Sequence, residues 1–362
     1  MRPYAVRAAL ALRAVSEEKM NVCDFRSDYM EGAHPKIIER LVKTNTEKTA
    51  GYGTDGYCEA AREKIRRACS APDSEVYFFV GGTQANATVL SSILLPYQGV
   101  VCCDTAHINC HEAGAVEATG HKVISTKGKD GKLTPEGLLS VIEQYENDES
   151  REHTVMPGCA YVSHPTELGT LYTKDELSRL SKICKEYSIP LFLDGARLGY
   201  GIAAPQSDLS LADIASLCDL FYIGGTKCGA LMGEALVVTN KTLCKSYFSM
   251  MKRHGAVLAK GRLLGLQFVT LFTDNLYVEI CKNGVELALY LKSELIARGY
   301  RTYIDSPTNQ QFFIITNEKY EQLKLKIGFT LWEKLPSGDV VIRLVTSFMT
   351  TKEQVDCLIS YF

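Results

Sequence analysis

A regular alternation between residues 75 and 239 constrains the fold most strongly. Short β-branched and aromatic runs alternate there with stretches of helical periodicity, which is the pattern of βαβ units around a mainly parallel sheet. The candidate strands are residues 76–80, 100–103, 122–125, 159–163, 190–193, 221–223 and 235–239. The clearest helix spans residues 174–187, because Thr173 and Glu176 form a capping box at its start. We therefore predict an α/β fold with a seven-stranded sheet flanked by helices.

The pattern changes after residue 272. A helical stretch at about 245–272 is followed by a long helix at about 275–298, by strands near Tyr303, Phe312 and Val341, and by helices around Tyr320 and Gln354. This order predicts a smaller α+β lobe. We divide the chain into an N-terminal extension (1–24), a large domain with an N-terminal arm (25–272) and a small C-terminal domain (273–362). Residues 24–56 are rich in turn-forming residues and predict loops.

Composition narrows the class of partner. The chain has 362 residues, long enough for a large core, and a formal charge of −2 with both signs spread along it. This distribution does not favour a nucleic acid or a membrane surface, and no apolar stretch is long enough to span a bilayer. A small-molecule partner is therefore expected. No cluster of His, Cys and carboxylates has the spacing of metal ligands, so we predict no metal.

Cysteine usage bears on the compartment. The 13 cysteines are scattered, without CxxC pairs or the even spacing of a disulfide framework, which favours a reducing compartment and hence the cytoplasm. Residues 1–15 contain Arg2, Arg7 and Arg13 among alanines and leucines, with no acid before Glu17. This is a weak mitochondrial-presequence pattern, and import into that organelle is the alternative.

Two apolar runs end abruptly in a charged side chain. Residues 191–197 read LFLDGAR and end in the carboxylate of Asp194, and residues 221–227 read FYIGGTK and end in Lys227. In open α/β sheets ligands bind at the carboxyl ends of the strands, so this acid and this amine are expected to face one crevice. Pyridoxal 5'-phosphate (PLP) requires such a pair, a lysine for its aldehyde carbon and an anion for its pyridinium nitrogen. The two runs therefore predict a PLP site.

A glycine turn supplies a candidate phosphate site. Strand 76–80 runs into Gly81, Gly82 and Thr83, and a helix follows from about Ala85. The free amides and the positive dipole end of such a helix N-terminus bind phosphate without a cationic side chain. Taken alone, the same pattern also fits a plain βα turn.

A histidine and a polar loop are expected at the same edge of the sheet. His107 follows strand 100–103 and a short turn, and an imidazole there can stack on a pyridine ring and relay a proton. The loop after strand 159–163 reads SHPTELGT from Ser163. A structural histidine and simple turn chemistry are the alternatives.

Two arginines are candidates for binding the carboxylate of an amino acid. Arg197 follows Asp194 by three residues, and Arg343 lies in the apolar strand VVIRL at 340–344. Guanidinium groups bind carboxylates bidentately, and an arginine inside an apolar strand with no acid beside it indicates an anionic ligand. Surface or ion-pair roles stay open for each arginine.

Taken in order, these motifs resemble the threonine aldolase and aromatic amino acid β-eliminating lyase family of fold-type I PLP enzymes. The resemblance runs from Phe25 to the C-terminus. Its motifs are Arg26-Ser27-Asp28, Tyr52-Gly53 with Asp55, Gly82-Thr83, Asp104 with His107, residues 194–197 (DGAR), Thr226-Lys227 and residues 342–346 (IRLVT). Many members carry Asn-Thr-His-Asn where this chain has His164 displaced by about one position and followed by proline. The PTELGT form occurs in a subgroup described as low-specificity aldolases.

The resemblance implies a role for each candidate residue. Lys227 would bind PLP covalently, Asp194 would pair with the pyridinium nitrogen, and His107 would stack on the ring; these three form the catalytic set. The cofactor-binding set is Gly82, Thr83, His107, Asp194, Arg197, Thr226, Lys227 and Lys260. Lys260 would reach the phosphate of a neighbouring subunit, a role for which Arg262 competes. The substrate carboxylate would be held by Ser27, Arg197 and Arg343.

The implied reaction is retro-aldol cleavage of L-threonine or L-allo-threonine to glycine and acetaldehyde. His107, or a water that it holds, would remove the hydroxyl proton. The family also implies a homodimer or homotetramer with sites completed across the subunit interface. Two alternatives stay open. One is PLP-dependent β-elimination or transamination of another amino acid. The other is a nucleotide-binding or scaffold protein, although the G-x-G-x-x-G spacing is missing.

Overall fold

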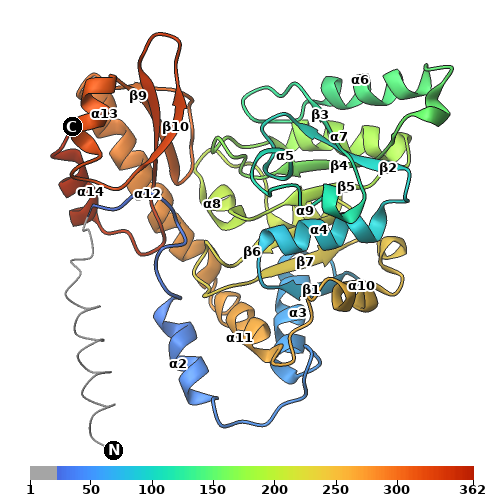
Figure 1. The fold of residues 1–362 in the computed structure, drawn as a ribbon. Coiled ribbons are helices and arrows are strands. Elements are labelled where there is room, and N and C mark those ends of the chain that lie inside the picture. Colours follow the sequence, from blue (N-terminus) through green and yellow to red (C-terminus); the bar gives the residue numbers. More distant parts are fainter. Residues whose placement is uncertain (1–22) are drawn as a thin grey trace, which may run out of the picture.

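The computed structural model describes residues 23–362. The predicted presequence pattern in residues 1–15, and nearly all of the predicted extension, lie outside the described residues. The chain forms a large and a small lobe, and one long helix, α12 (Leu276–Ala297), runs from the first into the second (Figure 1).

The large lobe is built around a seven-stranded sheet with the strand order β1-β7-β6-β5-β4-β2-β3. Its strands are β1 (Glu75–Phe79), β2 (Gln98–Cys103), β3 (Val123–Thr126), β4 (Met156–Ser163), β5 (Leu191–Asp194), β6 (Leu220–Gly224) and β7 (Glu234–Val238). β7 runs antiparallel to both of its neighbours, and the other adjacent pairs are parallel. All seven predicted strands are present with small shifts at their ends, which confirms a mainly parallel sheet.

Helices that precede, separate and follow the strands pack around the sheet. They are α3 (Gly56–Ala68), α4 (Gly82–Ile93), α5 (His107–Cys110), α6 (Pro135–Glu146), α7 (Lys174–Glu186), α8 (Leu198–Ala203), α9 (Leu211–Leu217), α10 (Tyr247–Arg253) and α11 (Arg262–Leu271). Short 3₁₀ turns occur at Glu117–Thr119, Arg151–His153 and Lys241–Cys244. The predicted capping box of α7 is confirmed, because Thr173 and Glu176 each accept a hydrogen bond from the other's backbone amide. The predicted helical stretch 245–272 is two helices, α10 and α11, separated by a loop.

The turn-rich segment 24–56 contains a helix that we did not predict, α2 (Pro35–Lys43). Pro35 is at its first turn, where a missing amide costs nothing, and the His34 side chain accepts from the amide of Lys36. Ile37 is fully buried, and α2 packs against α11. The predicted loop at 51–56 is confirmed by a turn with positive φ at Tyr52 and Gly53.

The small lobe is a four-stranded sheet with two helices, in agreement with the predicted α+β lobe. The strand order is β10-β11-β9-β8. The elements are β8 (Arg301–Thr302), β9 (Gln310–Ile315), α13 (Asn317–Leu323), β10 (Thr330–Lys334), β11 (Val340–Val345) and α14 (Lys352–Ile359). We did not predict β10, whose pairing with β11 is irregular. Among the described residues, no helix combines the length and apolarity needed to cross a membrane.

Two apolar cores underlie the two lobes. The larger core includes Cys281 and Val285 from the first half of α12, and the smaller core includes Leu291 and Leu295 from its second half. Phe25, near the start of the described chain, packs in the smaller core. The domain limits at 24/25 and 272/273 therefore stay a prediction, and both the arm and α12 connect the two lobes.

Candidate active site

A cavity of about 180 Å³ lies at the carboxyl ends of β1, β4, β5 and β6. This is the position where open α/β sheets bind ligands. The cavity brings together most of the predicted site residues: Gly82, Thr83, His107, Asp194, Arg197, Thr226 and Lys227. Ser27, Lys260 and Arg343 are not part of its lining. Ser163 and Glu167, from the polar loop that we expected at this edge, are part of it, and so are Tyr222 and Glu234, which we did not predict.

Asp194 is the last residue of β5 and is almost fully buried. Its Oδ2 accepts the Tyr161 hydroxyl at 2.5 Å and the Asn86 amide at 3.1 Å, and its Oδ1 accepts the Ala196 amide at 2.9 Å. Burial alone would raise the pKa of Asp194, but the charge of His107 and the hydrogen bonds from Tyr161, Tyr222 and the Ala196 amide outweigh it and lower the pKa. Asp194 is therefore a fixed anion at the cavity wall.

Lys227 lies in the turn after β6, and the Tyr200 hydroxyl fixes this turn by donating to the Lys227 carbonyl at 2.8 Å. No carboxylate of residues 23–362 lies within ion-pair distance of its amine. Burial lowers the pKa of Lys227, and the neighbouring Arg197 lowers it further, against the opposing charges of Asp28, Asp194 and Glu234. A lysine with a lowered pKa is a better nucleophile toward an aldehyde.

Glu234 lies behind Lys227 and organises its turn. The Thr226 hydroxyl donates to Glu234 Oε1 at 2.9 Å and accepts from the Gly233 amide at 3.0 Å, and the Gly225 amide donates to Glu234 Oε2 at 3.2 Å. Burial raises the pKa of Glu234 to about 8, although the charge of Lys227 opposes this. The signal that could have found Glu234 is a carboxylate at the start of an otherwise apolar strand.

His107 begins α5 and is joined to Asp194 by two further side chains. Its Nδ1 is 2.8 Å from Oε1 of the buried Glu112, which also accepts from Asn86 Nδ2 at 2.8 Å. The same Asn86 amide donates to Asp194. Burial alone would lower the pKa of His107, but the Glu112 hydrogen bond and the charge of Asp194 outweigh it and raise the pKa. No periodicity in the sequence marked Asn86 or Glu112.

The predicted glycine turn forms the start of α4. Its N-cap, Gly81, makes no side-chain capping bond, so the first amides of the helix stay available to an anion. A Cβ at Gly82 would lie 2.8 Å from the Tyr222 hydroxyl, so the backbone comes close to the cavity only because the residue is glycine. This turn fits a phosphate group.

The two predicted carboxylate-binding arginines differ in their partners. Arg197 donates from Nε to Asp28 Oδ2 at 2.7 Å and from Nη2 to Asp28 Oδ1 at 2.9 Å. Arg343 donates weakly to Gln310 and to the carbonyl of Arg26, its Nε has no partner, and no carboxylate of the described chain pairs with it. Burial and the nearby Arg197 lower the pKa of Arg343 to about 10. Of the two arginines, Arg343 is therefore the one without a carboxylate partner among the described residues, and its guanidinium lies over the Trp332 ring.

Ser27 and Lys260 do not line this cavity and lie at two other places in the structure. The Ser27 hydroxyl is buried beside Asp28 and has no hydrogen-bond partner among the described residues. Lys260 lines a separate surface pocket together with residues 45 and 47–50. Arg262, its competitor, donates to the carbonyl and hydroxyl of Thr44 and stacks on Tyr57. Arg262 is thus occupied within its own chain, whereas the Lys260 amine forms no hydrogen bond or ion pair with residues 23–362.

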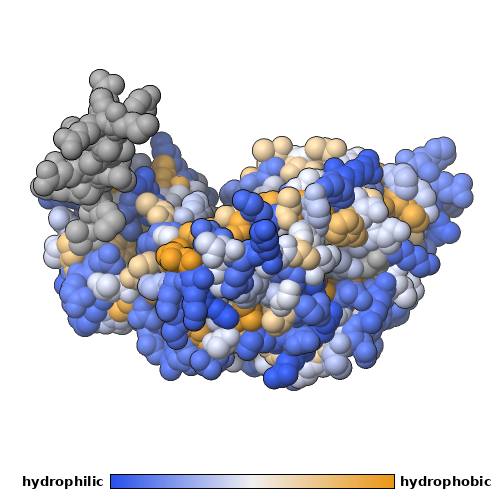
Figure 2. Space-filling model, turned by 90° about the horizontal axis from the view of Figure 1, so that it is seen from below, coloured by the Kyte–Doolittle hydropathy of each residue, from blue (hydrophilic) through white to orange (hydrophobic). Residues whose placement is uncertain are grey.

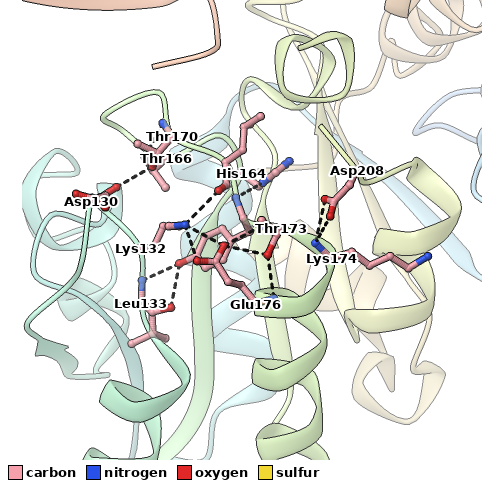
Figure 3. Close-up of polar contacts among 12 residues, drawn as sticks. Asp130, Lys132, Leu133, His164, Thr166, Thr170, Thr173, Lys174, Glu176 and Asp208 are labelled. Carbon is pink, nitrogen blue, oxygen red and sulfur yellow. Dashed lines mark hydrogen bonds and ion pairs between the residues drawn. The ribbon is translucent and has the colours of Figure 1, made fainter. Parts of the chain in front are cut away.

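His164 lies behind the cavity wall rather than in it. It is fully buried, its Nδ1 accepts from the Tyr172 amide at 3.3 Å, and its Nε2 has no partner within the described part of the chain. Figure 3 shows it beside the ion pair of Lys132 and Glu176. Burial lowers the pKa of His164 to about 4, and the Lys132 charge contributes. His164 is therefore a neutral structural imidazole that supports the loop.

Comparison with known proteins identifies the family. Residues 24–305 match the family model described as beta-eliminating lyase. The chain belongs to the beta-eliminating lyase family. A low-specificity L-threonine aldolase from a Pseudomonas species is 30% identical over 91% of this chain and 94% of that protein. The structure of a Leishmania major threonine aldolase superposes with a TM-score of 0.91 at 41% identity, covering 93% of this chain and 98% of the other.

A solved structure of lower sequence identity has the same fold. An aspartate aminotransferase of Thermus thermophilus covers all of this chain with a TM-score of 0.71 at 18% identity. This shows that the beta-eliminating lyase chain has the predicted fold-type I architecture. Its own residues fit PLP. A buried anion faces a buried amine of lowered pKa, and an uncapped helix N-terminus adjoins both. No metal-binding group of three or more side chains was found among the described residues.

Proposed function

We propose that this chain is a PLP-dependent lyase that cleaves L-threonine or L-allo-threonine into glycine and acetaldehyde. The observation that carries the proposal is the joint presence of Asp194, Lys227 and His107 around one cavity at the strand ends. The threonine aldolases that match nearly the whole chain support this choice of reaction. Beta-elimination and transamination use the same type of cofactor site, so product analysis has to accompany the test.

Different residues of the chain would bind different parts of the cofactor. Lys227 would bind its aldehyde carbon, Asp194 its pyridinium nitrogen, and the amides at Gly82 and Thr83 its phosphate. His107 would lie against the ring, fixed there by Glu112. When bound, PLP supplies an electron sink for the bond that breaks at Cα. Asp194 would hold a proton on the pyridine nitrogen, because its own lowered pKa keeps it an anion.

Substrate binding is assigned to the small-lobe side of the site. Arg343 is the candidate for the substrate carboxylate because its guanidinium has no acidic partner. The buried Ser27 hydroxyl is a second donor for the same carboxylate. Arg197 keeps only Nη1 free of Asp28, so its contribution is one hydrogen bond and its positive charge. Binding of the substrate carboxylate orients the Cα–Cβ bond of the substrate, and this orientation decides which bond breaks.

We infer that the enzyme is a homodimer or homotetramer. The Tyr52 loop and the Lys260 loop lie side by side, because the Tyr52 amide donates to the Ala259 carbonyl at 3.1 Å. Large apolar side chains stay exposed on the arm, on α2, in the Tyr52 loop and on α10: Tyr29, Met30, Val42, Tyr52 and Phe248. Figure 2 shows apolar patches interrupting the hydrophilic surface on the face seen from below. Light scattering that found a fully active monomer would contradict this inference.

We propose the cytoplasm as the compartment, because the described cysteines are free thiols and mostly buried. Mitochondrial import remains the alternative, since it depends on residues 1–15. Localising a C-terminal fluorescent fusion of the full chain, with and without residues 1–15, distinguishes the two.

The central experiment uses the purified protein loaded with PLP. It should be yellow and should release glycine and acetaldehyde from L-threonine or L-allo-threonine, while pyruvate and sulfide, assayed in parallel with cysteine and tyrosine as substrates, stay at background. Lys227→Ala should lose the visible absorbance of the bound cofactor and both products. Release of pyruvate without acetaldehyde would overturn the aldolase assignment in favour of beta-elimination.

A further inference from the structure

Glu167 is a buried carboxylate in the cavity wall that the reaction described above does not use. It follows β4 in the loop that reads SHPTELGT. Its Oε1 accepts the Ser163 hydroxyl at 2.7 Å and the His107 amide at 3.0 Å, while its Oε2 is buried without a partner among the described residues. Ser163 and Glu167 both line the cavity that holds Asp194 and Lys227. A carboxylate with one unused oxygen, reached through a serine at the cavity wall, is an arrangement suited to receiving a proton.

The loop that carries Glu167 is held from three sides. Thr170 donates to the Asp130 carbonyl at 2.7 Å, and Lys132, which pairs with Glu176 of α7, donates to the Leu171 carbonyl at the end of the loop at 3.3 Å (Figure 3). From the small lobe, the Ser306 and Thr308 hydroxyls each donate to the Gly169 carbonyl at 3.1 Å. Gly169 has φ of +73°, and a Cβ there would lie 2.3 Å from the Ser306 hydroxyl, so only glycine fits. The loop therefore presents Glu167 in a fixed position.

Ser163 lies next to the cofactor anion. It is paired in register with Asp194 across β4 and β5, which places its hydroxyl at the same strand ends. The two carboxylates of this region have opposite tendencies, since the pKa of Asp194 is lowered whereas burial raises the pKa of Glu167 and the charge of Asp194 adds to that rise. Two acids whose pKa values are pushed apart in one site commonly have separate roles. Asp194 keeps its charge, and Glu167 is the one suited to gain a proton.

Other groups around Glu167 affect its charge. They are His107 and Cys110 of α5, Cys102 and Cys103 of β2, Tyr161 of β4, Tyr172 ahead of α7 and Asp194 of β5. Only His107 in this set favours the ionised form of Glu167 by its charge. Because the pKa of His107 is itself raised, His107 is charged over a wider pH range, and a smaller fraction of it is in the neutral form that can accept a proton.

We propose that Ser163 and Glu167 form a proton relay for the β-hydroxyl of the substrate. The inference rests on the proposed aldolase function. The substrate O–H bond breaks as its proton passes to Ser163 Oγ, and the proton of Ser163 passes to Glu167. The Cβ–O bond becomes the C=O of acetaldehyde, the Cα–Cβ bond breaks, and its electron pair stays on Cα. Cα then takes up one proton to give glycine, so no oxidant, reductant or further reactant is required.

The test compares bond cleavage with a reaction that needs no β-hydroxyl. Glu167→Gln and Ser163→Ala should each lower kcat for L-threonine by on the order of 10²–10⁴, the usual contribution of general acid–base catalysis. Exchange of the glycine α-proton with D₂O, followed by NMR, and the glycine Kd should both stay within about threefold, a change worth less than about 1 kcal/mol. Ser163→Thr retains a hydroxyl and should restore most of the cleavage. Glu186→Gln, a change at an exposed glutamate of α7, is the matched control.

A second readout does not use the loaded enzyme. Infrared spectra of the cofactor-free protein, recorded against pH, should show a protonated-carboxyl band that titrates above the ordinary glutamate range and is missing in Glu167→Gln. The relay is overturned if either variant keeps wild-type cleavage, if cleavage and glycine exchange fall together, or if the band titrates in the ordinary range. A wild type that does not cleave threonine while it exchanges the glycine α-proton would instead refute the proposed function.

Discussion

Arg197 and Asp28 form a two-point ion pair, with Nε–Oδ2 and Nη2–Oδ1 distances of 2.7 and 2.9 Å. Asn309 of the small lobe donates to the same Oδ2 at 2.9 Å. Burial alone would raise the pKa of Asp28, but Arg197 and Lys227 outweigh it and lower the pKa. The N-terminal segment that carries Asp28, the large lobe that carries Arg197 and the small lobe that carries Asn309 therefore meet at the ionised carboxylate of Asp28 beside the site.

Asp28→Asn is expected to destabilise the protein by about 3–5 kcal/mol, because it leaves the buried guanidinium of Arg197 without its counter-ion. Urea denaturation followed by circular dichroism measures this. The double variant Asp28→Asn/Arg197→Met removes both charges and should recover most of the lost stability. A single variant as stable as the wild type would show that Asn309 and water suffice to compensate Arg197.

Gly82→Ala is expected to weaken PLP binding roughly 5- to 150-fold, since the added Cβ would meet the Tyr222 hydroxyl and overpacking costs about 1–3 kcal/mol. Equilibrium titration with PLP, read from its absorbance, gives the Kd. Gly81→Ala is the matched control, because a Cβ there meets nothing within 4 Å. Gly82→Ala/Tyr222→Phe removes the clashing oxygen and should recover part of the affinity. Equal effects of the two glycine substitutions would contradict the steric explanation.

Arg343→Gln is expected to raise KM for L-threonine about 10- to 150-fold, because a hydrogen bond to a charged group contributes about 1.5–3 kcal/mol. Arg343→Lys should recover only part of this loss, since a lysine cannot bind a carboxylate at two points. Steady-state kinetics measure both variants. Arg301→Gln, at an exposed arginine of the same lobe, should leave KM unchanged. An unchanged KM in Arg343→Gln would contradict this assignment and leave Arg197 as the candidate for binding the substrate carboxylate.

Local pattern was enough to predict the framework of the site. Each apolar run of the large sheet is a strand in the structure, and Asp194 and Lys227, which were proposed because each ends such a run, both line the cavity. Helix α2 was not predicted because its stabilising contacts are tertiary, in particular the burial of Ile37 in the core of the large lobe. Strand β10 was not predicted because it is half exposed and pairs irregularly with β11. Its side chains therefore do not alternate between buried and exposed positions.

Partnerships between distant residues could not be predicted. Asp28 and Arg197 are 169 positions apart, and the chain from Asp194 through Asn86 to Glu112 joins three separate segments. Such contacts leave no periodic signal in one sequence. Glu234 and Glu167 differ, because an acid inside an apolar strand or directly after one is itself unusual. The polar residues nearest the strand ends were therefore within reach of sequence reasoning.

His164 should make the protein sensitive to mild acid. Its folded-state pKa of about 4 lies below the ordinary histidine value of 6.5, so between these values the unfolded chain binds one more proton than the folded one. The stability that His164 contributes is therefore complete above about pH 6.5 and is lost as the pH falls toward 4. The full shift corresponds to about 3 kcal/mol. Urea denaturation at pH 7 and pH 5 gives the free energy of unfolding above the sensitive range and within it.

His164→Asn isolates this contribution. An asparagine oxygen can still accept the Tyr172 amide that His164 Nδ1 accepts, but it does not titrate. The variant should therefore lose less stability than the wild type between pH 7 and pH 5, whatever its stability at pH 7. Asp28 and Asp194, whose pKa values are lowered from 3.8, act at lower pH and are common to both proteins, so they cancel in the comparison. An identical pH dependence in the two proteins would mean that the folded state protonates His164 as readily as the unfolded chain does.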